Sequence, residues 1–79
     1  MRVLLFARLR ELSGVDCMEM EVPEGTTLGE LWRQLQTVTP PLRVFTHPPL
    51  MARNLEYAGA DTPLSVNDEV AFLPPVSGG

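Results

Sequence analysis

The chain is short and acidic: 79 residues, six arginines, no lysine, ten aspartates and glutamates, and a net charge of −4. A domain of this size buries only about 60% of its unfolded surface, which leaves little room for a bound cofactor or a deep catalytic pocket. Because it has no basic run, we expect no nucleic-acid or membrane partner. A carrier or binding protein fits these limits better than a self-contained enzyme.

Cysteine usage and hydropathy indicate a soluble cytoplasmic protein. The one cysteine, Cys17, cannot form an internal disulfide, and no secretory signal pattern opens the sequence. The apolar runs are far shorter than the roughly 20 residues that a membrane-spanning helix needs.

The first quarter of the chain contains two strand patterns and a short helix. Residues 3–6 are apolar on both faces, as in a central strand. Ala7–Ser13 has a helical pattern closed by Gly14. Residues 18–22 alternate apolar and acidic side chains, which predicts a half-buried strand.

The one strong helix pattern begins at Thr27, which forms the capping-box spacing with Glu30. Its apolar residues fall at i, i+3, i+4 and i+7: Leu28, Leu31, Trp32 and Leu35. Four prolines follow between residues 37 and 49, so we predict a long irregular connection there.

The second half of the chain predicts further strands at Leu50–Asn54 and Glu69–Leu73, with turns or a short strand between them. These elements pack most simply as an α+β domain, residues 1–73, in which a mixed sheet lies on one main helix. The predicted core consists of Val3, Leu5, Met20, Leu28, Leu31, Trp32, Leu35, Val70 and Phe72.

The C-terminal tail, residues 74–79, is the most informative segment. Its two prolines forbid helix, so we expect an extended segment. Six residues span roughly 20 Å, and Gly78 and Gly79 have no side chains to block a narrow channel. The terminal carboxylate is ionised and unreactive at neutral pH, so its chemistry requires activation by another protein. A frayed, inert terminus is the alternative.

Strand alternation predicts a docking surface. Val70 and Phe72 point to one face of the sheet, and Ala71 and Leu73 to the other. One main helix covers only one face, so the second face is expected to be an exposed apolar surface for a partner. Cover by the connection 37–49 is the alternative.

Other residues have ordinary explanations. We expect Cys17 to pack rather than to act as a nucleophile, His47 to lie in a loop with no metal site, and Trp32 to lie in the core. The glutamates between residues 19 and 30 form a solvated face, with docking of a basic partner as the alternative. The absence of lysine fits genome composition or thermal adaptation better than an exclusion of isopeptide chemistry.

Both ends of the chain resemble a known family. Residues 3–7, Arg10-Glu11-Leu12 with Gly14, and above all residues 67–79 resemble the small subunit of molybdopterin synthase, the MoaD type of ubiquitin-like sulfur carrier. The most specific part is the pattern D-E-V-A-F-x-P-P-V-[ST]-G-G, and the resemblance covers essentially the whole chain. It implies a β-grasp fold.

The resemblance also implies a sulfur-delivery cycle. Gly79 is adenylated by an E1-like adenylyltransferase (MoeB type) and converted to a thiocarboxylate. The tail then enters the large synthase subunit (MoaE type), which transfers the sulfur to precursor Z (cyclic pyranopterin monophosphate) for molybdenum cofactor biosynthesis. The chain is not catalytic alone and binds no cofactor, since the activating enzyme uses the ATP. The implied partner-binding residues are Phe72, Leu73, Pro74, Pro75, Val76, Ser77 and Gly78.

Two other classes of function remain open. One is a sulfur carrier of the same fold for thiamin, cysteine or tRNA thiolation. The other is a ubiquitin-like protein modifier, or an interaction module with an inert Gly-Gly end. The spacing of the whole tail favours molybdopterin synthesis.

Overall fold

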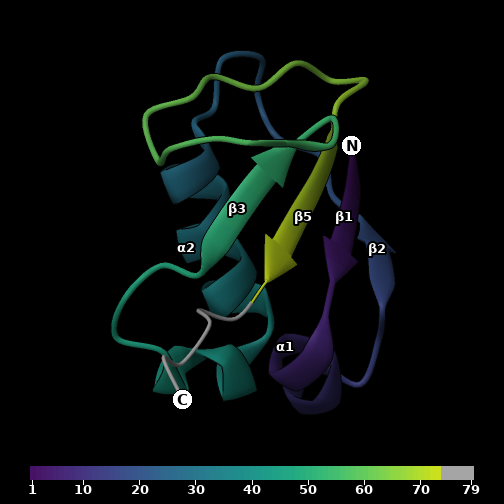
Figure 1. Ribbon diagram of the computed structural model, residues 1–79, viewed down its shortest axis with the longest axis vertical. Helices are drawn as coiled ribbons and strands as arrows, with labels where there is room; N and C mark the ends of the chain where they lie inside the picture. Colours follow the sequence, from purple (N-terminus) through teal and green to yellow (C-terminus); the bar gives the residue numbers. More distant parts are fainter. Residues whose placement is uncertain (74–79) are drawn as a thin grey trace.

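The computed structural model describes residues 1–73, in which a five-stranded mixed sheet lies against α2 (Figure 1). Its strand order is β2-β1-β5-β3-β4. Only the β1–β5 pair is parallel among these neighbours. The predicted α+β fold and its β-grasp arrangement are confirmed. The strands are β1 (Arg2–Leu5), β2 (Cys17–Glu19), β3 (Leu50–Arg53), β4 (Glu56–Tyr57) and β5 (Glu69–Leu73), and the helices are α1 (Ala7–Ser13), α2 (Leu28–Val38) and the 3-10 helix η1 (Pro40–Val44).

The last strand, β5, is the middle strand of the sheet. It pairs in parallel with β1, where Leu5 lies opposite Phe72, and antiparallel with β3, where Leu50 lies opposite Leu73. A parallel pair needs a long crossover connection, and the chain between β1 and β5 supplies it. The strand that precedes residues 74–79 is therefore held on both sides.

The main helix begins and packs as predicted. The Glu30 amide donates to Thr27 Oγ1 at 3.3 Å, and the Thr27 amide donates to Glu30 Oε1 at 3.0 Å. Trp32 packs against Phe72 with ring centroids 5.3 Å apart. All nine predicted core residues are buried, and Met20 is the most exposed of them at 8%.

The connection between α2 and β3 is more regular than predicted. α2 continues to Val38, and η1 follows with its prolines in the first turn, where a missing amide donor costs nothing. Leu42 of η1 is fully buried. The Gln36 side-chain amide donates to the carbonyls of Leu42 and Phe45 at 3.0 and 3.1 Å, and so holds the connection against the helix.

Other departures are small. Helix α1 ends at Gly14 as predicted, with φ at 80° and the Gly14 amide bonded to the Arg10 carbonyl. Strand β2 stops at Glu19, earlier than predicted, although the Met20 amide still bonds to the Met1 carbonyl at 3.0 Å. No helix in residues 1–73 is long and apolar enough to cross a membrane.

A polar network joins the β3–β4 turn to the start of β5. The Asn54 side-chain amide donates to Asp68 Oδ1 at 3.0 Å, and the Glu69 amide donates to Asn54 Oδ1 at 2.9 Å. The Ser65 amide donates to Asp68 Oδ2 at 2.8 Å. The hydrogen bond from Ser65, followed by that from Asn54, holds the pKa of Asp68 below its ordinary value.

Truncating Leu35 to alanine should destabilise the fold by about 2–5 kcal/mol, because its side chain is fully buried between α2 and the sheet. Urea denaturation measures this change. Truncating Val38, which is 61% exposed on the same helix, is the matched control and should change the stability by less than about 0.5 kcal/mol. A loss at Leu35 no larger than that at Val38 would contradict the assignment of the core.

Replacing Asp68 with alanine should reduce the free energy of unfolding at neutral pH, and less so in acid. A carboxylate with a lowered folded pKa stabilises the fold above its unfolded pKa of about 3.9. This contribution is lost as the pH falls through the folded pKa. The difference in free energy of unfolding between wild type and variant should therefore become smaller once the pH falls below about 4.

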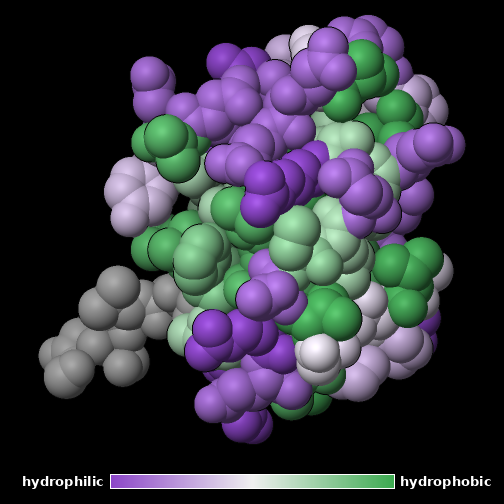
Figure 2. All heavy atoms as spheres, turned by 90° about the vertical axis from the view of Figure 1, so that its right-hand side faces the viewer, coloured by the Kyte–Doolittle hydropathy of each residue, from purple (hydrophilic) through white to green (hydrophobic). Residues whose placement is uncertain are grey.

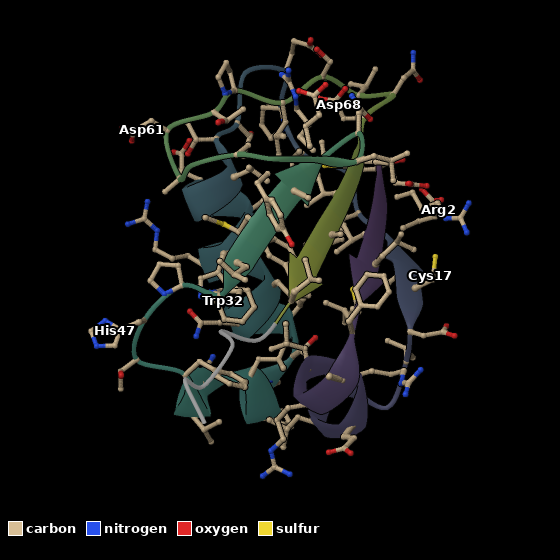
Figure 3. The ribbon with its side chains drawn as sticks, viewed as in Figure 1. Arg2, Cys17, Trp32, His47, Asp61 and Asp68 are labelled. Carbon is tan, nitrogen blue, oxygen red and sulfur yellow. The ribbon has the colours of Figure 1, made fainter. Side chains whose placement is uncertain are left out.

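The measurement is urea denaturation across a pH series. Asp61→Ala is the control, because Asp61 is exposed on the same end of the molecule (Figure 3) and forms no hydrogen bond among the described residues. A gap at Asp68 that stays constant with pH would show that its ionised form does not support the fold.

Candidate functional site

The structure describes two of the predicted site residues, Phe72 and Leu73, and places them on opposite faces of β5. Phe72 is fully buried against Trp32, so the prediction that its side chain contacts a partner is corrected: it belongs to the core. Leu73 is half-buried on the face away from α2. The other predicted site residues lie outside the described residues, and their roles stay predictions: Pro74, Pro75, Val76, Ser77, Gly78 and Gly79.

The face of the sheet opposite α2, here called the outer face, carries a continuous row of uncharged side chains. Cross-strand register places Leu4 opposite Ala71, Ala71 opposite Ala52, and Ala52 opposite Tyr57. Side chains at directly opposed positions share a face of the sheet. A second pair, Leu50 and Leu73, extends the row towards the end of β5.

No helix of the described residues covers this face. In Figure 1, α2 lies behind the strands, and the front of the sheet has no helix over it. The connection 37–49 was the alternative cover, but η1 packs against α1 and α2 instead. The predicted exposed apolar face is therefore present. Figure 2, which views the side of the molecule that carries β2, shows hydrophobic side chains at the surface among hydrophilic ones.

A depression of about 260 Å³, here called the outer groove, lies on this face. Alanines on the two central strands leave its floor low, and larger side chains from β1 and from the β3–β4 hairpin form its walls. Its ends correspond to the two ends of β5, with Leu73 at one and Glu69 at the other. The lining residues are Leu4, Phe6, Ala52, Leu55, Tyr57, Glu69, Ala71 and Leu73.

Leu55, in the wall of the groove, has a backbone conformation and a side-chain exposure that are both unfavourable for a leucine. Its φ of 72° lies in the left-handed region that favours glycine. Its side chain is 91% exposed. The positive φ belongs to the two-residue turn between β3 and β4, in which Asn54 also has a positive φ of 51° between the paired residues Arg53 and Glu56. The exposed apolar side chain favours a docking role for the groove.

Charged side chains border the groove at the start of β5. Register places Arg2 between Glu69 and Glu19, and the Arg2 Nη1 lies 3.8 Å from Glu69 Oε2. Cys17 lies opposite Leu4 on the same face. Figure 3 shows Arg2 and Cys17 close together at the β2 side of the molecule.

The remaining candidates from the sequence are separated from the groove. Trp32 is buried in the core, as predicted. His47 is exposed in the connection, on the side of the molecule opposite Cys17 (Figure 3). Within residues 1–73, no three histidine, cysteine, aspartate or glutamate side chains gather to form a metal-ligand set.

The described residues thus form an exposed apolar groove, and the predicted reactive group follows it in sequence. Sequence analysis identified Leu73 on the outer face but missed Leu4, Phe6, Leu55 and Tyr57, which line the same groove. Alternation shows which residues of one strand share a face. Strand order and register decide which residues of neighbouring strands lie side by side. Both are set by contacts distant in sequence.

Comparison with known proteins places these features in a family. The ThiS family model matches residues 3–79. The molybdopterin synthase sulfur carrier subunit of Mycobacterium tuberculosis (strain ATCC 25618 / H37Rv) is 42% identical over 78 residues, which cover 98% of this chain and 94% of that protein. Relatives of the same name in other organisms are 34–40% identical.

Solved structures share the fold. The small archaeal modifier protein 1 of Haloferax volcanii aligns with a TM-score of 0.83 and 27% identity over 95% of each chain. A chain in the complex of subunits 1 and 2 of the molybdopterin-converting factor of Helicobacter pylori 26695 aligns with a TM-score of 0.66 and 24% identity, over 99% of this chain and 96% of that chain. The chain described here belongs to the ThiS family, in which its relatives at 34–42% identity are molybdopterin synthase sulfur carrier subunits.

Proposed function

We propose that this protein is the sulfur-carrier subunit of a molybdopterin synthase, acting in the cytoplasm. The observation that carries the proposal is the position of β5. This central strand ends at Leu73, beside the apolar outer groove, and the residues that follow it in sequence are the Gly-Gly tail. A partner that docks on the groove is therefore next to the residue at which the tail begins.

The chemistry of the tail needs no side chain from this protein. An E1-like adenylyltransferase of the MoeB type joins the Gly79 carboxylate to AMP, with ATP as the source and pyrophosphate as the leaving group. A sulfur donor then displaces AMP, so that a carbon–sulfur bond replaces the carbon–oxygen bond to the phosphate. The resulting thiocarboxylate is a soft, ionised nucleophile. Inside the large subunit its sulfur bonds to precursor Z, and water then cleaves the bond between this sulfur and the Gly79 carbonyl carbon, which restores the carboxylate.

The outer groove supplies binding free energy that a tail ending in two glycines lacks. Burying apolar surface is worth roughly 25 cal/mol per Å², and aromatic and aliphatic anchors in the centre of an interface dominate affinity. Tyr57 and Leu55 are 75% and 91% exposed and offer such anchors. We propose that the MoaE-type large subunit covers this face while the tail reaches its active site.

The alternatives share the tail chemistry and differ in the acceptor. A carrier for thiamin, cysteine or tRNA thiolation needs the same thiocarboxylate, and a protein modifier needs the same adenylate but passes it to an amine. The names of the relatives at 34–42% identity support molybdopterin synthesis over both. Transfer of sulfur to precursor Z in a reconstituted synthase distinguishes the three.

Replacing Leu73 with aspartate should weaken binding to the large subunit by at least about tenfold, because an unpaired carboxylate must be desolvated within an apolar interface. Isothermal titration calorimetry with the purified large subunit measures this. Val38→Asp places the same charge on an exposed residue of α2, away from the outer face, and is the control. Equal affinities for the two variants would place the interface elsewhere.

Deleting Gly79 should abolish adenylation and sulfur transfer and leave the fold intact. The reactive carbonyl carbon would move one residue back along the tail, out of reach of the activating enzyme's nucleotide. Intact mass spectrometry after incubation with the E1-like enzyme, ATP and a sulfur donor checks this. Wild type should gain the mass difference between sulfur and oxygen, and the variant should not.

One further variant completes the experiment on the tail. Gly78→Phe keeps the terminal carboxylate but adds a side chain, and should block transfer by excluding the tail from the channel. Circular dichroism and urea denaturation should match wild type for both variants. Full molybdopterin synthesis by the chain lacking Gly79 would rule out the carrier function.

A further inference from the structure

We propose that the outer groove accepts an arginine or lysine side chain of the docked partner, with the Glu69 carboxylate as its counter-ion. This inference rests on the proposed docking role of the outer face and adds the chemistry that the face selects. It concerns one residue of the partner and one carboxylate of this chain.

The shape and polarity of the groove match a long cationic side chain. Its floor consists of the small residues Ala52 and Ala71, and apolar side chains line it from Leu73 onwards. The one charged residue in its lining, Glu69, lies at the far end of β5. Arginine and lysine lay aliphatic stems along apolar surfaces and keep a charged head at a polar site. An apolar or anionic occupant would instead desolvate the Glu69 carboxylate and leave it with only its open pair to Arg2, at a cost in affinity.

Hydrogen bonds hold the backbone of Glu69 in place, but within residues 1–73 its carboxylate has only one weak partner. Its amide donates to Asn54 Oδ1 at 2.9 Å, and its carbonyl accepts from the Asn54 amide at 2.8 Å, so its backbone is held. Within residues 1–73, its carboxylate forms an ion pair only with Arg2, at 3.8 Å. The Arg2 and Glu69 side chains are 58% and 36% exposed. An open pair at this distance contributes little free energy.

The surrounding charge favours a cation over an anion. The chain carries a net charge of −4. On the outer face, Arg2 lies opposite both Glu19 and Glu69, and the Met1 ammonium lies 3.5 Å from Glu19 Oε2. Glu69, which within residues 1–73 has only its open pair with Arg2, is therefore the carboxylate left for a cation of the partner. Complementary charge on the partner would speed association and fix its orientation on the sheet.

Replacing Glu69 with glutamine keeps the shape of the side chain and removes its charge. We expect the affinity for the purified large subunit, measured by titration calorimetry at low salt, to fall by about tenfold or more. The salt dependence of binding should also become weaker. Glu19→Gln removes a charge from the same row outside the groove, where the side chain is 77% exposed, and should change affinity by no more than about twofold.

Arg2→Gln tests the sign of the effect. Removing the only competing cation frees Glu69 for the partner, so affinity should stay unchanged or rise. A loss of affinity for Arg2→Gln that exceeds the loss for Glu69→Gln would show that the surface binds an anion, and would overturn the proposal. So would wild-type affinity and salt dependence for Glu69→Gln.

Three other outcomes also bear on the proposed cation site. Self-association of the free protein that disappears in Glu69→Gln, measured by analytical ultracentrifugation, would assign the groove to a second copy of the chain and overturn the proposal. If Leu73→Asp binds the large subunit like wild type, docking on the outer face fails as a whole. If Leu73→Asp is impaired and Glu69→Gln is not, only the cationic side chain is ruled out and the proposed function stands.

Discussion

The burial of Phe72 is the constraint on which the rest of the structure depends. Its ring packs against Trp32 of α2, and its backbone lies between β1 and β3. A strand anchored at one residue has its neighbours fixed as well, because side chains alternate between the two faces. Leu73 and Ala71 therefore point outwards, and the exposed groove follows from the core contact.

Within residues 1–73 the outer face is left open because α2 and η1 pack together on the other face of the sheet. The apolar stripe of α2 covers one face of the sheet. The proline-rich connection, which contains η1, packs beside α2 through the buried Leu42 and the hydrogen bonds of Gln36. Within residues 1–73 no comparable element remains for the other. Exposed apolar surface and a strained Leu55 reduce stability. The fold tolerates both at a surface where a partner would bury them.

Local signals predicted the parts of the fold that depend on neighbours in sequence. The capping box at Thr27, the apolar stripe of α2 and the Gly14 terminus each need only a few residues, and each is present. The outer groove depends on register between four strands, so its walls were missed although Leu73 was placed on the right face. Phe72 was counted both as core and as partner-binding, since a motif match transfers a whole segment without separating its two faces. The regular path of the connection depends on a glutamine amide that bonds to the carbonyls of Leu42 and Phe45, which no periodic pattern indicates.

A sulfur carrier must bind two enzymes in turn, one that activates the tail and one that uses it, and must leave both. The outer groove lies beside the end of β5, so under the proposed function two partners that each need the tail would compete for the same face. Tight binding to either would block the cycle, because affinity within one interface is tuned mainly through the dissociation rate. A groove of about 260 Å³ with one weakly paired carboxylate suits that requirement. It contributes enough contact to orient the tail, and little enough to allow release after each transfer.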